Sequence, residues 1–110
     1  METRTSNKLS KDKLLEISQK WQEKLKVSIT RIQIKKMENK WSSCSTNGNI
    51  TLNSELAKLP QELAEYAILH EILHLIVPNH GKTFKALLSA HMPNWEELHN
   101  QLTRLQNSQS

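Results

Sequence analysis

The spacing of hydrophobic residues changes along the chain, and each change predicts a change of secondary structure. After Ser10, a suitable N-cap, apolar side chains recur every three or four positions, which is typical of a helix with one buried face. These side chains are Leu14, Ile17, Trp21 and Leu25. From Val27 to Ile34 apolar and polar residues alternate, with a break near Thr30, and this pattern predicts strand structure.

A pair of short strands is predicted next. Asn47-Gly48 supplies the positive φ angles that a tight hairpin turn requires. We therefore expect residues 41–45 and 50–52 to be paired strands on either side of this turn.

Prolines divide the second half of the chain into three predicted helices. The first covers about residues 60–76 and stops before Pro78, and the second covers about 82–90 and stops before Pro93. The third follows Asn94, a good N-cap, and has an apolar face up to Leu105. An order of helix, strands and then helices predicts an α+β fold with a small antiparallel or mixed sheet.

Length and composition narrow the class of protein. A chain of 110 residues is expected to form a single domain, 1–110, with flexible ends at 1–9 and 107–110. The single cysteine, Cys44, excludes an internal disulfide framework and favours a cytoplasmic location, and we expect Cys44 to be a small buried residue. Neither a secretory signal nor a membrane-spanning segment is predicted. The net charge of +4 permits contact with nucleic acid without arguing for it.

The segment His70-Glu71-Ile72-Leu73-His74 carries the strongest chemical signal. On a helix, residues i and i+4 lie on one face, so His70 and His74 can bind a single Zn²⁺. Glu71 lies about 100° around the helix from His70, where it can face the metal without being a ligand. This arrangement is typical of a carboxylate that takes a proton from a metal-bound water.

His80 is the candidate for a third ligand. Pro78 ends the helix between His74 and His80, so the chain can turn back towards the metal. Three imidazoles leave one coordination position for water, as in catalytic sites. The alternatives are an amphipathic helix with two packed histidines, and a structural zinc site, which favours four protein ligands.

Five segments in order resemble the YgjP-like zinc metallopeptidase family, which is related to SprT-like and minimal gluzincin-type zincins. They are Trp41-Ser42-Ser43-Cys44, Gly48-Asn49-Ile50-Thr51-Leu52-Asn53, the HExxH motif, Pro78-Asn79-His80 with Phe84, and Met92-Pro93-Asn94-Trp95. The resemblance covers Ile32 to Leu105. It implies a zincin-like fold, with an active-site helix and three further helices, metal on His70, His74 and His80, and Glu71 as base. Ser42 departs from the family, which usually has glycine there.

We expect a zinc metallopeptidase acting on peptide or protein substrates. Glu71 would accept the proton of the zinc-bound water and return it to the leaving amine. Tyr66 and His91 are candidate donors to the charged intermediate, and His99 is interpreted as a solvated surface residue. In zincins an edge strand pairs with the substrate, which makes Trp41, Ser42 and Ser43 candidate substrate-binding residues.

Three alternative functions would use some of the same residues. A metzincin-like site has the same interval between its second and third histidines, but it needs glycine where this chain has Val77. A metal-dependent hydrolase of another bond, such as a phosphoanhydride or a small amide, would use the same residues. A SprT-like protease or binding module acting at DNA would use the basic residues between Lys11 and Lys36.

Overall fold

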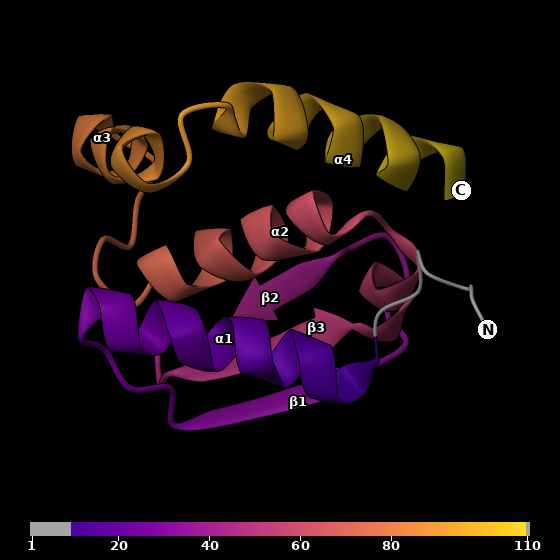
Figure 1. The fold of residues 1–110 in the computed structure, drawn as a ribbon, viewed down its shortest axis with the longest axis horizontal. Helices are drawn as coiled ribbons and strands as arrows, with labels where there is room; N and C mark the ends of the chain where they lie inside the picture. Colours follow the sequence, from indigo (N-terminus) through magenta and orange to yellow (C-terminus); the bar gives the residue numbers. More distant parts are fainter. Residues whose placement is uncertain (1–9, 110) are drawn as a thin grey trace, which may run out of the picture.

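Four α-helices and one three-stranded sheet make up the part of the chain that the computed structural model describes, residues 10–109 (Figure 1). The elements are α1 (Lys11–Leu25), β1 (Arg31–Lys35), β2 (Ser42–Cys44), β3 (Asn49–Asn53), a 3₁₀ helix η1 (Ser54–Lys58), α2 (Gln61–Leu73), α3 (Lys82–His91) and α4 (Trp95–Gln109). The predicted α+β class with a small mixed sheet is confirmed.

The sheet has β3 at its centre, in the order β1-β3-β2. β1 runs parallel to β3, with Arg31 opposite Asn49, whereas β2 runs antiparallel to it, with Ser43 opposite Thr51. Gly48, at φ 85°, closes the predicted hairpin between β2 and β3. β2 is therefore an edge strand, and it lies close to α2.

The strand predicted from Val27 is shorter than expected. It begins only at Arg31, because α1 ends in a left-handed residue, Lys26, and the chain then forms a loop. The Ile29 N–H donates to the side-chain oxygen of Gln22 instead of to a neighbouring strand. Apolar alternation alone does not distinguish such a loop from a strand.

Helix α2 is the central element of the fold. It lies between the sheet and α4, with α1 packed along its side (Figure 1). Nine of its thirteen residues are buried, so it is apolar on nearly every face, as expected of a helix enclosed by other elements. Its regular part ends at Leu73, three residues earlier than predicted, and Ile76 is 41% exposed.

Two buried polar groups hold the start of β2. The fully buried Asn53 side chain donates to the carbonyl oxygens of Met37 and Lys40 and accepts from the Glu55 N–H. The Trp41 indole N–H donates to the Leu102 carbonyl of α4 over 3.0 Å. These bonds fix the chain immediately before Ser42 against both the sheet and α4.

Most of the residues expected to be flexible lie outside the described part of the chain. Residues 1–9 and 110 lie outside the described residues, while α4 continues to Gln109, through most of the segment expected to be a polar tail. None of the helices in residues 10–109 has the length and hydropathy needed to cross a membrane.

Candidate metal centre

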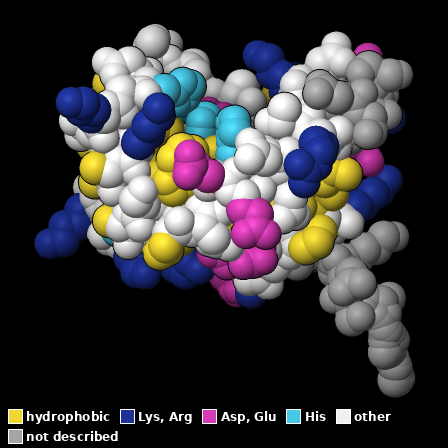
Figure 2. All heavy atoms as spheres, turned by 90° about the horizontal axis from the view of Figure 1, so that it is seen from above, with side chains coloured by type: hydrophobic (Ala, Val, Ile, Leu, Met, Phe, Trp, Pro, Cys, Tyr) yellow, Lys and Arg dark blue, Asp and Glu magenta, His cyan; other side chains and the backbone are white. Residues whose placement is uncertain are grey.

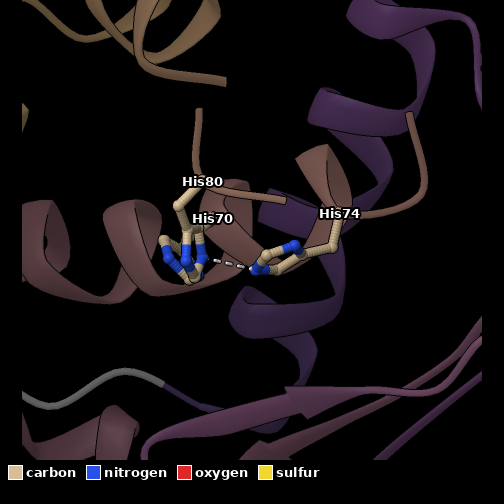
Figure 3. Close-up of side chains that lie close together, drawn as sticks. All are labelled: His70, His74 and His80. Atoms are coloured by element: carbon tan, nitrogen blue, oxygen red, sulfur yellow. Dashed lines mark hydrogen bonds between the residues drawn. The ribbon is translucent and has the colours of Figure 1, made fainter. Parts of the chain in front are cut away.

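His70, His74 and His80 converge at one place on the surface. One ring nitrogen from each lies within 4.8 Å of the others, and the rings point toward one another (Figure 3). His74 Nε2 and His80 Nε2 are 2.9 Å apart. Figure 2 shows histidine side chains gathered on this face, with basic side chains on both sides.

The local backbone explains how His80 reaches the other two. After Leu73 the helix tightens, and the N–H groups of residues 74–76 bond to carbonyls three residues back. The turn passes Pro78, and the Asn79 side chain accepts from the Gly81 N–H over 3.1 Å before α3 begins. The predicted reversal of the chain after the helix is therefore present, although it starts earlier.

Phe84 of α3 forms an aromatic floor beneath the three histidines. Its ring centroid is 5.2 Å from that of His70, 4.9 Å from that of His74 and 4.8 Å from that of His80. Since Phe84 is almost fully buried, it restricts the motion of the rings and shields one side of the cluster from water.

The donor set fits a divalent metal ion. Burial lowers the pKa of His74 and of His80, and the nearby His70 lowers both further, so the imidazoles favour the neutral form that binds metals. Two nitrogens bound to one tetrahedral zinc ion are about 3.3 Å apart, which is within the range spanned by this cluster.

Glu71 is buried beside the histidines, with 7% of its surface exposed. The Ser42 hydroxyl of β2 donates to Glu71 Oε2 over 2.7 Å, and His70 Nδ1 lies 3.6 Å from the same oxygen. Burial acts to raise the pKa of Glu71, but the contacts with His70 and Ser42 outweigh it, and the pKa lies below its usual value. Glu71 is therefore ionised at neutral pH and able to accept a proton.

Three cavities adjoin this cluster. One of about 370 Å³ follows β2 past Ser43 and Cys44 to Glu71 and His74. One of about 210 Å³ lies between β2, α2 and α4 and reaches Trp41 and His70. The third, of about 330 Å³, lies between α2, α3 and α4 and has Phe84, Leu88 and Trp95 in its wall. Together they border the histidines on both sides.

Tyr66 and His99 separate two of these cavities. The Tyr66 hydroxyl lies 2.9 Å from His99 Nδ1, and both residues line the 210 Å³ and the 330 Å³ cavities. Tyr66 is buried next to His70, whereas His99 is exposed, as expected, but engaged in this bond. The contact between Tyr66 and His99 was not predicted from the sequence. One signal for it was present, because His99 is adjacent to Leu98 and lies three residues before Leu102, and both leucines are on the buried face of the helix.

The remaining candidates differ in their positions. Trp41, Ser42 and Ser43 all border the cavities along β2. His91 instead packs edge-on against Trp21, with ring centroids 5.6 Å apart, and lines none of these three cavities. Cys44, expected to be buried, is half-exposed and lines the cavity along β2. This difference arises because the outer side of the edge strand is open to solvent.

The family model described as YgjP-like, metallopeptidase domain matches residues 3–105. No curated protein matches the chain.

Two crystal structures have a similar fold. One is the metallopeptidase zymogen of Methanocaldococcus jannaschii jannalysin, with a TM-score of 0.75 and 27% identity over 94% of this chain and 97% of that one. The other is the metallopeptidase zymogen of Pyrococcus abyssi abylysin, with a TM-score of 0.73 and 18% identity over 83% of this chain and 92% of that one. At 18% identity the second comparison concerns the fold alone.

Proposed function

This chain belongs to the YgjP-like metallopeptidase family, and from that premise we propose that it hydrolyses peptide bonds with a zinc ion held by His70, His74 and His80. The observation that carries the proposal is the convergence of three imidazole nitrogens beside a buried, ionised carboxylate. When bound, zinc would lower the pKa of a water ligand towards about 7 and polarise the substrate carbonyl.

Glu71 would act as general base and then as general acid. Its ionised carboxylate can accept the proton of the attacking water and return it to the nitrogen of the leaving amine. Burial beside Ser42 and His70 keeps the carboxylate in one place, so little reorganisation is needed when the proton moves.

The substrate would bind in an extended form along β2. This strand pairs with β3 on one side only, and a cavity of about 370 Å³ follows it to Glu71 and His74. Backbone pairing of this kind gives affinity with little dependence on sequence.

Selectivity would come from the cavity of about 330 Å³, whose wall includes Phe84, Leu88 and Trp95 and which also touches His70 and His80. We expect it to take a large apolar side chain next to the scissile bond.

Tyr66 and His99 are the proposed source of a second hydrogen bond to the charged intermediate. Both border the cavities next to His70, and they are joined to each other. His91, which packs on Trp21, is left out of the proposed site.

Metal analysis of the purified protein, together with digestion of a peptide library, tests this function. We expect about one zinc ion per chain, cleavage that a chelator abolishes and zinc restores, and enrichment of a large apolar residue on one side of the cut. Glu71→Gln should keep its zinc and lose at least about a hundredfold in kcat. Bound metal without cleavage of any peptide would favour hydrolysis of another bond, and a Glu71→Gln variant as active as the parent would refute the role of Glu71.

A further inference from the structure

The hydrogen bond between Ser42 and Glu71 connects two elements that are far apart in the sequence. Ser42 is the first residue of the edge strand β2, and Glu71 lies near the end of α2. The hydroxyl donates to Oε2 over 2.7 Å, which is short, as expected for a bond to a charged acceptor. The bond therefore holds one of the two carboxylate oxygens.

The other oxygen of Glu71 is left accessible. Among the described residues, no side chain or backbone group donates to Oε1, and this atom is not one of the buried polar atoms without a partner. Because Oε1 has no partner and is not fully buried, it retains contact with solvent, and Glu71 lines both the cavity along β2 and the cavity between β2, α2 and α4. The two oxygens therefore have different surroundings.

Ser42 is itself firmly placed. It pairs with Leu52 of β3, and the residue before it, Trp41, accepts from the Asn53 N–H over 2.9 Å. The Trp41 indole is bonded to Leu102 of α4. A hydroxyl supported from both sides can fix a partner without losing much conformational entropy itself.

We infer that Ser42 is a positioning residue for Glu71: its hydroxyl holds Oε2 in place so that Oε1 is presented to the reacting water. This inference rests on the proposed function. The proton acceptor and the peptide would then be held by the same strand, because β2 contributes this hydroxyl and is also the strand on which the substrate would pair. In this role the Ser42 hydroxyl would contact neither the substrate nor the metal.

Three variants test the inference. Ser42→Ala removes the hydroxyl, and Ser42→Thr retains it. Ser18→Ala is the control, because Ser18 is a serine that is likewise hydrogen-bonded to a side chain, but it is buried on α1. We expect Ser42→Ala to lower kcat about tenfold with little change in KM or zinc content. The Tm should fall, because the buried carboxylate loses a donor. Ser42→Thr should recover most of the loss, and Ser18→Ala should match the parent in kcat.

Crystal structures of the parent and of Ser42→Ala provide a readout that does not depend on activity. We expect the Glu71 carboxylate to rotate or to occupy more than one position in the variant. An unchanged carboxylate would overturn the inference, as would an unchanged kcat in a protein that Glu71→Gln inactivates. A Ser42→Ala variant as inactive as Glu71→Gln would also overturn it, because Ser42 would then take part in the chemistry. Failure of the parent to cleave any peptide would refute the proposed function, and the two structures would still decide the positioning.

Discussion

The hydroxyl of Tyr66 lies 2.9 Å from Nδ1 of His99, and this contact joins α2 to α4 directly beside His70. Burial, and then the charge of Glu71, raise the pKa of Tyr66 well above its usual value, so the phenol keeps its proton at neutral pH. No other acceptor for this hydroxyl lies among the described residues, so we expect Tyr66 to donate and the accepting Nδ1 to carry no proton. The proton of neutral His99 is left on Nε2, where it is available as a donor.

This tautomer can be measured. We expect ¹⁵N NMR of the metal-free protein to show His99 mainly as the Nε2–H form at pH values where it is neutral. Tyr66→Phe should weaken that preference, since the fixed donor is removed, whereas the signals of His91 should not change. A parent protein with Nδ1 of neutral His99 protonated would contradict the assignment.

Loss of His80 should affect metal binding far more than folding. Its side chain is exposed and follows the end of α2, so His80→Ala should leave the Tm of the metal-free protein nearly unchanged. Zinc at a hundredfold excess over Kd would stabilise the parent by about 2.7 kcal/mol, and most of this gain should disappear in the variant. The measurement is thermal unfolding with and without zinc.

A second histidine provides the control for that experiment. His91→Ala removes an imidazole that packs on Trp21, so it can lower the Tm of the metal-free protein. Its zinc-induced increase should nevertheless equal that of the parent. An equal increase in His80→Ala would show that His80 is not a ligand.

The Cys44 thiol should react slowly near neutral pH. Burial, and then the charge of Glu71, raise its pKa, so the fraction present as thiolate is smaller than in a free cysteine. We expect alkylation by iodoacetamide at pH 7.5 to be slower in the folded protein than in urea, and to accelerate about tenfold per pH unit up to the raised pKa.

Replacement of Glu71 provides a test of the electrostatic part of this effect. Glu71→Gln removes the negative charge, which should lower the pKa of Cys44 and accelerate alkylation at pH 7.5. A rate equal to that of the parent would mean that burial alone protects the thiol.

Gly48→Ala should destabilise the fold. Gly48 has φ of 85°, and an added Cβ would lie 2.8 Å from the Oγ1 atom of Thr30. The backbone strain alone costs about 1–2 kcal/mol, and urea unfolding should show a loss of at least that size. The double variant Thr30→Ala/Gly48→Ala should recover the part due to the clash.

Gly81→Ala is the comparison for this prediction. Gly81 has a negative φ, and its added Cβ would meet only the Asn79 side-chain oxygen at 3.0 Å. We expect a smaller change in the free energy of unfolding. Equal stability of Gly48→Ala and the parent would contradict the strained turn.

Much of the fold could be predicted from local patterns. The interval of three or four residues in α1, the Asn47-Gly48 turn and the spacing of His70 and His74 depend only on residues a few positions apart. The turn that brings His80 back was expected from Pro78, although the regular helix ends at Leu73, before the proline. The boundaries were less accurate, because β1 and the end of α2 depend on bonds to side chains and on the tightening of the last turn.

The sequence by itself determined the helices, the tight turn and the HExxH segment, because short-range sterics and helical geometry decide them. Only the tertiary structure decided that β1 pairs parallel to β3, that Ser42 meets Glu71 across 29 residues, and that Tyr66 meets His99 across 33. These contacts depend on how α2 is enclosed by the sheet and α4. Packing of that kind is a property of the whole core, and no local pattern of residues specifies it.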